Sequence, residues 1–310
     1  MQPKTVLLIA GGGTLGSYTA DELLNLGCRV DIICLEDRVS DREDLQFYKA
    51  LANDQYLQQF FENRHYDGIV NFVHYGEPER YHPIHPLLLA HTDHLIFVSS
   101  YRVYADEQHP VTETAPQLLD VSRDKQFLET EKYAVSKAKA ERFLRSPAGA
   151  GRWTIARPVI SFSARRLDLI TRSRREVVDM ARAGDVIDLP LDAKNLTAGL
   201  DWAGNAGKLI AHLLFKEEAI GEAFTVSSAQ NLTWGEVADI YTKLVGAKFR
   251  WIDTETYLEK HQKDPYVLLY DRLFDREIDN RKILAVTGLT ERDFVSIEDG
   301  IRRELQNLDE

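Results

Sequence analysis

The stretch TVLLIAGGGTLGSYTADELLNLG, residues 5–27, joins a strand pattern, a glycine turn and a helical pattern. The apolar run TVLLIA predicts a buried strand, and the pattern that begins at Thr14 predicts a helix. Between them, Gly11, Gly13 and Gly16 satisfy the spacing G-x-G-x-x-G. Glycines allow a tight turn and a close approach of the backbone to a pyrophosphate, whose charge is stabilised at a helix N-terminus. The stretch predicts a dinucleotide-binding turn; the alternative is a glycine-rich turn without a ligand.

The alternation of strand and helix continues through the first half of the chain. Further strands are expected in RVDIIC (29–34), DGIVNFV (67–73), DHLIFVSS (93–100) and RWTIARP (152–158). Helices are expected in NDQYLQQFFENR (53–64), PLLLAHT (86–92) and FLETEKYAVSKAKAERFLRS (127–146). Strands that alternate with helices indicate βαβ units and a parallel sheet covered on both faces. We therefore predict an α/β fold, a Rossmann-like doubly wound parallel sheet.

The alternation loosens after about residue 160. An arginine-rich helix is expected over 164–183, followed by a short strand, VIDLP, and a helix–strand–helix series. We expect residues 1–160 to form the cofactor-binding domain, with 199–228 returning to it. Residues 161–310 are expected to form mostly a smaller, interleaved substrate-binding lobe.

The composition of the chain argues against several classes of protein. The net charge of −11 and the pI of about 5.4 argue against nucleic-acid binding, because phosphate recognition needs a basic field. The N-terminal apolar run is too short for a signal peptide, and no stretch reaches the length of a membrane span. Cys28 and Cys34 lie in and beside one expected strand and cannot easily bridge, which favours reduced thiols and a cytoplasmic protein. Prolines interrupt the histidine-rich stretch 82–94, so no metal site is expected.

The end of the second expected strand bears on cofactor choice. Glu36 or Asp37 could hold the adenosine ribose of NAD, as an acidic residue at this place does in dinucleotide-binding folds. Arg38 could instead meet the extra phosphate of NADP. NAD is the expected cofactor and NADP the alternative.

Two other segments carry residues suited to proton transfer. The strand 93–100 ends with Ser99 and Ser100, at the edge where a parallel sheet presents its functional groups. Tyr133 and Lys137 are four apart, so a helix places them on one face. A free tyrosine has a pKa near 10, and a neighbouring ammonium group would favour the phenolate that acts as a base. The alternative for Tyr133 and Lys137 taken alone is a solvated helix face.

Taken together, the motifs resemble the extended short-chain dehydrogenases/reductases, in particular the NAD-dependent epimerase/dehydratase family that acts on nucleotide sugars. The matching pieces occur in order: AGGGTLG (10–16), FVSSYRVY (97–104), VTETAP (111–116), YAVSKAKAE (133–141), IARPV (155–159), FTVSSAQNLTWGEVADIYTKLVG (224–246) and DREIDNRKILAVTGL (275–289). The chain departs from the family pattern at Ala10, where relatives carry glycine, and at Cys34, where they carry aspartate.

The resemblance implies an NAD(P)-dependent epimerase, dehydratase or reductase. It implies that Tyr133 is the base, that Lys137 also holds the nicotinamide ribose, and that Ser100 bonds the substrate oxygen. The cofactor contacts that it implies, beyond Tyr133 and Lys137, are Gly11, Gly13, Thr14, Leu15, Gly16, Glu36, Asp37, Arg38, Val73, His74 and Pro158. The substrate contacts that it implies are Ser99, Ser100, Tyr101 and Arg272. In the arginine-rich stretch, Arg165 and Arg166, or Arg172, Arg174 and Arg175, could bind a diphosphate in a bidentate manner, and the alternative is a solvated helix face.

The resemblance also bears on partners. It implies a nucleotide sugar as the small-molecule substrate, and relatives often form homodimers, so a homodimer is expected. The alternative function is a catalytically altered family member that binds a nucleotide or RNA. The segment around Asp279 and Lys282 supports this alternative, because it is similar to that of the chloroplast stem-loop RNA-binding proteins.

Overall fold

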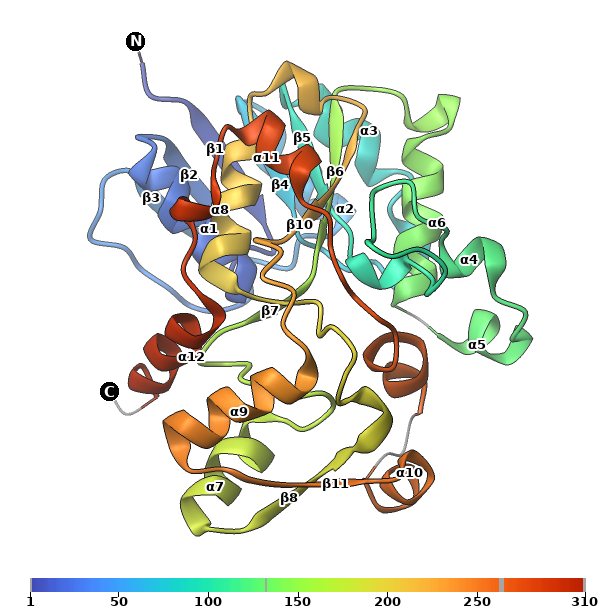
Figure 1. Ribbon diagram of the computed structural model, residues 1–310. Coiled ribbons are helices and arrows are strands. Elements are labelled where there is room, and N and C mark those ends of the chain that lie inside the picture. Colours follow the sequence, from blue (N-terminus) through green and yellow to red (C-terminus); the bar gives the residue numbers. More distant parts are fainter. Residues whose placement is uncertain (1, 132, 262–264, 309–310) are drawn as a thin grey trace.

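A seven-stranded parallel sheet forms the centre of the computed structural model, which describes residues 2–131, 133–261 and 265–308 (Figure 1). The strand order is β10-β6-β5-β4-β1-β2-β3, and every neighbouring pair is parallel. The strands are β1 (Thr5–Ile9), β2 (Arg29–Cys34), β3 (Leu45–Lys49), β4 (Gly68–Asn71), β5 (Leu95–Val98), β6 (Trp153–Pro158) and β10 (Ala223–Val226). This sheet confirms the predicted Rossmann-like α/β fold.

Helices cover both faces of the sheet. One face carries α1 (Thr14–Asn25), α8 (Ala203–Leu213) and α11 (Arg281–Thr287), and the other carries α2 (Asp54–Phe61), α3 (Ile84–Ala90) and α6 (Ala134–Leu144). Along β1, Val6 and Leu8 pack toward the first group, whereas Leu7 and Ile9 pack toward the second. Burial on both faces explains why the strands appear in the sequence as continuous apolar runs. In the described part of the chain, no helix is long and apolar enough to cross a membrane.

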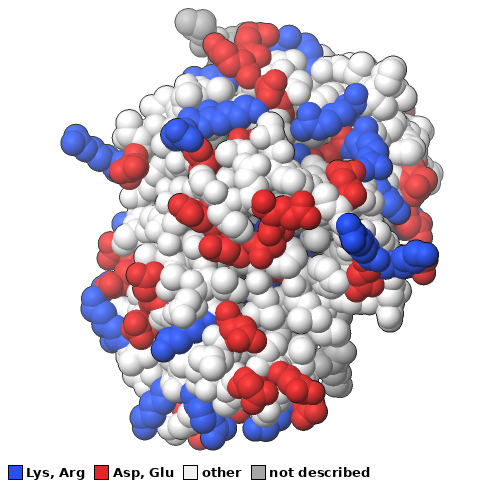
Figure 2. Space-filling model, turned by 45° about the vertical axis from the view of Figure 1, so that its right-hand side comes forward, with Lys and Arg blue, Asp and Glu red and all other residues white. Residues whose placement is uncertain are grey.

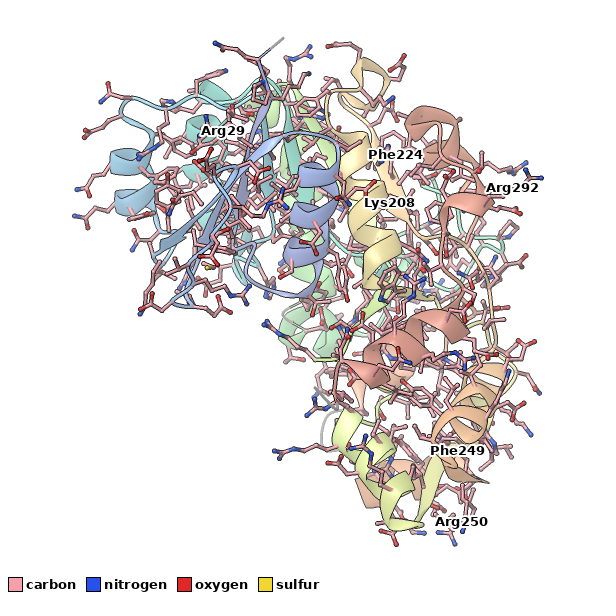
Figure 3. The ribbon with its side chains drawn as sticks, turned by 90° about the vertical axis from the view of Figure 1, so that its left-hand side faces the viewer. Arg29, Lys208, Phe224, Phe249, Arg250 and Arg292 are labelled. Atoms are coloured by element: carbon pink, nitrogen blue, oxygen red, sulfur yellow. The ribbon has the colours of Figure 1, made fainter. Side chains whose placement is uncertain are left out.

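A second lobe lies beyond the carboxyl ends of the strands (Figure 1). It contains two small parallel sheets, β7 (Ile160–Phe162) with β9 (Leu200–Trp202) and β8 (Val186–Pro190) with β11 (Lys248–Ile252). Its helices are α7 (Met180–Ala183), α9 (Trp234–Val245), α10 (Thr254–His261) and α12 (Ile297–Gln306). Figure 3 shows Phe249 and Arg250 of β11 at the far end of this lobe, whereas Phe224 of β10 lies in the main sheet. The chain passes between sheet and lobe several times.

The predicted helix over 127–146 is two helices. The first of them, α5 (Lys125–Thr130), ends at Thr130, and the second, α6, starts at Ala134. A further short helix, α4 (Leu118–Val121), precedes both. Tyr133 occupies the N-cap position of α6, and its carbonyl accepts the Lys137 N–H at 3.0 Å. The Tyr133–Lys137 pair therefore spans the first turn of α6.

The predicted helix over 164–183 is wrong for its first half. Only Arg175–Asp179, a π-helix, and α7 are helical. The preceding residues form two reversals, in which Ser163 bridges Arg166 and Leu169 bridges Arg172. Ile170 has a φ of 56°, a left-handed conformation that a right-handed helix excludes. The strand β3 was not predicted, because its half-exposed side chains lack the apolar run of its neighbours.

The glycine turn brings α1 against the end of β1. The Gly11 N–H donates to the Ile33 carbonyl at 3.2 Å, and Gly13 is the N-cap of α1. A Cβ on Gly16 would lie 2.2 Å from the Gly11 oxygen. A Cβ on Gly13 would have no described heavy atom within 4 Å. Gly16 is therefore required for the packing of helix on turn, whereas Gly13 faces open space.

A buried ion pair joins α6 to β6. Arg157 and Glu141 are both 1% exposed, and Nη2 of Arg157 lies 2.5 Å from Oε2 of Glu141. The other carboxylate oxygen of Glu141 accepts the Ser99 hydroxyl at 2.5 Å. The guanidinium of Arg157 also donates to the Tyr104 hydroxyl at 2.7 Å. These contacts fix the residues that follow β5 against α6.

We expect Gly16→Ala to lower the free energy of unfolding by about 1–3 kcal/mol, because the added methyl group would overlap the Gly11 carbonyl. Gly13→Ala is the matched control, and we expect it to change this free energy by less than about 1 kcal/mol. Denaturant titration followed by circular dichroism measures both variants. Equal losses would contradict the packing role of Gly16.

We expect Arg157→Met to destabilise the protein by about 3–5 kcal/mol, because it leaves the Glu141 carboxylate buried without its cation. The double variant Arg157→Met/Glu141→Leu removes both charges and should recover at least half of that loss. The same denaturant titration compares the two. A double variant no more stable than Arg157→Met would show that the buried charge is not the cause.

Candidate active site

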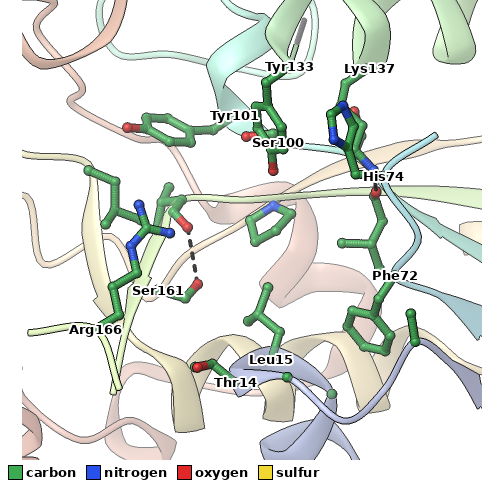
Figure 4. A pocket seen from close by; sticks show the side chains of 18 residues that line it. Thr14, Leu15, Phe72, His74, Ser100, Tyr101, Tyr133, Lys137, Ser161 and Arg166 are labelled. Atoms are coloured by element: carbon green, nitrogen blue, oxygen red, sulfur yellow. Dashed lines mark hydrogen bonds between the residues drawn. The ribbon is translucent and has the colours of Figure 1, made fainter. Parts of the chain in front are cut away.

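A cavity of about 360 Å³ opens at the carboxyl edge of the sheet, where the strand order reverses between β1 and β4 (Figure 4). Connections after these two strands run to opposite sides, and this divergence leaves the crevice in which open α/β sheets bind ligands. The glycine turn forms one wall, and the ends of β4, β5 and β6 with the start of α6 form the others. The predicted site residues that line it are Gly13, Thr14, Leu15, Gly16, His74, Ser99, Ser100, Tyr101, Tyr133, Lys137 and Pro158.

A second cavity, of about 220 Å³, continues from the first across the glycine turn. The two cavities share Ala10 and Gly13, and the second is also lined by Val73, Cys34 and Glu36. Their linings together extend from the end of β2 to the start of α6.

The acidic candidates after β2 point in different directions. A Cβ on Gly12 would lie 2.4 Å from Oε2 of Glu36, so this carboxylate rests against the glycine turn. Its pKa is lowered by a hydrogen bond from its own backbone N–H and by the nearby Arg38. Asp37 instead pairs with Lys49 at 2.9 Å on the exterior. Glu36 is therefore the acidic group placed to meet a ligand in the second cavity.

Ala10 keeps the backbone conformation for which glycine is suited. Its φ is 56°, in the left-handed region, where an L-residue is disfavoured by about 1–2 kcal/mol. The glycine turn therefore keeps its backbone conformation although Ala10 replaces a glycine. The methyl group of Ala10 forms part of the walls of both cavities.

Lys137 is held from behind by the sheet. It is 4% exposed, and Nζ donates to the Val98 carbonyl at 2.7 Å and to the Val73 carbonyl at 3.1 Å. Burial lowers the pKa of Lys137 to about 7, although Glu141 opposes this effect. The ends of β4 and β5 thus fix the ammonium group at the floor of the cavity.

Tyr133 and Ser100 lie together on the side of the cavity opposite Thr14 and Leu15 (Figure 4). Ser100 is 4% exposed, and its hydroxyl oxygen accepts the Arg102 N–H at 3.2 Å. The ring centroid of His74 lies 4.9 Å from that of Tyr133, and Nε2 of His74 hydrogen-bonds the Ser136 hydroxyl at 3.0 Å. A hydroxyl, a phenol and an ammonium group therefore converge on one end of the cavity.

The arginines are arranged differently from the prediction. Arg166, and not Arg165, lines the cavity, where its Nε also pairs with Asp168 at 2.9 Å (Figure 4). Arg165 and Arg38 both donate to the Gly12 carbonyl, at 3.4 and 2.9 Å. The reversal at 163–166 places Arg166 in the cavity lining with its side chain half exposed, and a helical pattern gives no sign of this.

Five predicted site residues lie outside the lining of both cavities in the described structure: Gly11, Asp37, Arg38, Arg165 and Arg272. Arg272 is 5% exposed, pairs with Asp271 and donates from Nε to the Ile170 carbonyl at 2.9 Å. Gly11 is buried beneath the turn. Phe72 and Ser161 line the first cavity and were not predicted. Their places just after β4 and within β7 are the signals that could have identified them.

Solved structures of similar fold cover nearly the whole chain. The epimerase Mth375 from Methanothermobacter thermautotrophicus has a TM-score of 0.73 and 18% identity, over 98% of this chain and 92% of that one. WbmG from Bordetella bronchiseptica, solved in complex with NAD, has a TM-score of 0.71 and 16% identity over 99% and 94%. UDP-glucuronic acid 4-epimerase from Bacillus cereus, solved with UDP-glucuronic acid and NAD, has a TM-score of 0.70 and 14% identity over 98% and 99%. These likenesses show a shared fold.

Sequence comparison identifies the family of the chain, which the structural likenesses alone do not. No curated protein matches the chain significantly. The model of the NAD dependent epimerase/dehydratase family matches residues 7–185, which is more than half of the chain. The matched segment contains the glycine turn, Ser100, Tyr133 and Lys137. The chain belongs to the NAD-dependent epimerase/dehydratase family, a family of enzymes of the extended short-chain dehydrogenase type.

Proposed function

We propose that the protein epimerises, dehydrates or reduces a nucleotide sugar, or a similar hydroxylated substrate, with NAD as its cofactor. One observation carries this proposal: a single cavity is bordered both by the glycine turn and by Ser100, Tyr133 and Lys137. A dinucleotide held on the turn would thus meet the three polar groups at its far end.

The residues present fit NAD. Gly13 leaves open space at the N-terminus of α1, where the backbone N–H groups suit a pyrophosphate. Glu36, which lines the second cavity, would bind the adenosine ribose hydroxyls, and its negative charge would oppose the extra phosphate of NADP. Lys137, which lines the first cavity, would bind the nicotinamide ribose. When bound, NAD supplies a carbon that accepts a hydride and can return it.

Tyr133, Lys137 and Ser100 have different roles in the proposed reaction. Tyr133 takes the proton of a substrate hydroxyl while the hydrogen on the same carbon leaves with its electron pair, so that a carbonyl forms. Lys137 favours the phenolate form of Tyr133 through its positive charge. Ser100 donates a hydrogen bond to the substrate oxygen as it becomes the carbonyl oxygen. In the reverse direction, Tyr133 returns the proton.

We assign substrate recognition to the side of the cavity that faces the second lobe, and hence mostly to residues 161–310. Arg166 and Ser161 lie there, across from Ser100 (Figure 4). A guanidinium group can bind the diphosphate of a nucleotide sugar in a bidentate manner. UDP-glucuronic acid in the Bacillus cereus structure shows that this fold accommodates such a substrate.

The charge distribution gives no support to RNA binding. The net charge is −11, and basic and acidic side chains are interspersed on the face shown in Figure 2. Nonspecific binding to phosphates needs a basic surface. The enzyme function is therefore favoured over the RNA-binding alternative.

We expect Tyr133→Phe to reduce turnover at least about 100-fold, because general acid–base catalysis contributes roughly 10²–10⁴-fold. NAD affinity and thermal stability should stay near the wild-type values. Turnover is measured by chromatography after incubation with NAD and either UDP-glucose or UDP-glucuronic acid. Tyr56→Phe, a half-buried tyrosine on α2, is the control. Wild-type turnover by Tyr133→Phe would remove Tyr133 from the mechanism.

We expect the wild type to bind NAD more tightly than NADP, and Glu36→Gln to narrow that preference roughly ten-fold. The reason is the loss of a charged hydrogen bond, worth about 1.5 kcal/mol, together with the loss of repulsion toward the extra phosphate. Isothermal titration calorimetry with both cofactors measures the change. Asp37→Asn, on the neighbouring exterior residue, should leave the preference unaltered. An equal effect of the two variants would argue against a specific role for Glu36.

A further inference from the structure

A second cation covers the ring of Tyr133. Arg102 lies in the 3-10 turn Tyr101–Val103 that follows Ser100, and its guanidinium carbon is 5.2 Å from the centroid of the Tyr133 ring. Its side chain is 16% exposed. Its backbone N–H is the donor to the Ser100 hydroxyl oxygen at 3.2 Å. Arg102 thus contacts the hydroxyl of Ser100 through its backbone and the ring face of Tyr133 through its side chain.

Two carboxylates hold the guanidinium group in this place. Nη2 of Arg102 lies 3.5 Å from Oε1 of Glu131, and Nε lies 3.4 Å from Oδ2 of Asp271. The other oxygen of Glu131 accepts the backbone N–H groups of Tyr133 and Val135, each at 3.0 Å. Glu131 therefore ties Arg102 to the residues that begin α6.

Two further arginines share the buried carboxylate that Arg102 contacts. Asp271 is fully buried and faces three guanidinium groups, those of Arg102, Arg272 and Arg276. Burial alone would raise the pKa of Asp271, but these three cations lower it. Within the described residues, Nε of Arg102 and both Nε and Nη2 of Arg276 have no hydrogen-bond partner. Glu131 is a second carboxylate beside Arg102, and Asp168 acts on Arg272 as a third.

We propose that Arg102 is a positioning residue that acts together with Lys137 to stabilise the phenolate of Tyr133. This inference rests on the proposed function of Tyr133 as the base. The charge of a phenolate is partly delocalised into its ring, so a guanidinium group over the ring face attracts it. An opposite charge within about 4–6 Å lowers the pKa of an acid by roughly 1–3 units.

Lys137 and Arg102 lose their positive charges at different pH values. Burial lowers the pKa of Lys137 to about 7, so Lys137 is charged below that pH and loses its proton above it. A guanidinium group stays charged throughout the working range of an enzyme. Arg102 therefore maintains the attraction on the alkaline side of neutrality, where Lys137 no longer does.

The other charged groups around Tyr133 do not replace Arg102. His74, from the segment after β4, contacts the Tyr133 ring with its imidazole and carries a positive charge only when it is protonated. Glu131 is negative, but it is engaged by Arg102 and by two N–H groups. Arg166 lines the cavity on the flank opposite Tyr133 and pairs with Asp168 (Figure 4).

The test is a direct titration of Tyr133 by NMR. Protein is labelled with tyrosine that carries an isotope at the hydroxyl-bearing ring carbon, and the Tyr133 signal is assigned by its loss in Tyr133→Phe. We expect Arg102→Met to raise the titration midpoint of Tyr133 by about one pH unit. Arg102→Lys, which keeps the charge, should retain most of the wild-type midpoint. Arg292→Met, on the exposed surface labelled in Figure 3, should leave it unchanged.

An unmoved midpoint in Arg102→Met, or an equal shift in Arg292→Met, would overturn the inference. Arg102→Gln keeps hydrogen-bonding capacity without the charge and carries the same test if Arg102→Met does not fold. Turnover by Tyr133→Phe separates this inference from the proposed function. A raised midpoint with a fully active Tyr133→Phe would uphold the effect of Arg102 and reject only the role of Tyr133 as the base. An unmoved midpoint with an inactive Tyr133→Phe would reject only the role of Arg102.

Discussion

The contact between Gly16 and Gly11 is the constraint on which the site depends. The first turn of α1 lies so close to the end of β1 that a single methyl group on Gly16 would meet the Gly11 carbonyl at 2.2 Å. This closeness directs the N-terminus of α1 toward the point where the strand order reverses. Both cavities meet there, at Ala10 and Gly13. A looser turn would move the helix terminus away from the crevice that the sheet leaves open.

The remaining residues of the candidate active site are held by a second set of contacts, between α6 and the sheet. Glu141 and Lys137 are four residues apart and both face inward. Glu141 binds Arg157 of β6 and the Ser99 hydroxyl, and Lys137 binds two carbonyls at the ends of β4 and β5. Buried charges are tolerated only where such partners compensate them. The same contacts that stabilise α6 therefore place Tyr133 beside Ser100.

Sequence reasoning predicted the parts of the fold that depend on local signals. The parallel sheet followed from continuous apolar runs, and the turn from the spacing of Gly11, Gly13 and Gly16. It did not identify β3, because LQFYK is half-exposed, nor the reversals over 163–172. The spacing of the arginines in the sequence is the same whether the backbone forms a helix or reverses at Ile170. For that reason the sequence alone could not distinguish Arg166, which lines the cavity, from Arg165, which does not.

The charge distribution of the protein now has a consistent explanation. An overall charge of −11 would disfavour an anionic cofactor and an anionic substrate if it were spread evenly over the molecule. Instead, Arg102, Arg272 and Arg276 surround one buried carboxylate behind Tyr133, and Arg166 lines the cavity itself. Salt screens the interactions of buried charges less than those of exposed charges. The arginines that Asp271 holds, together with the half-exposed Arg166, can thus make the cavity attractive to anions although the protein as a whole is acidic.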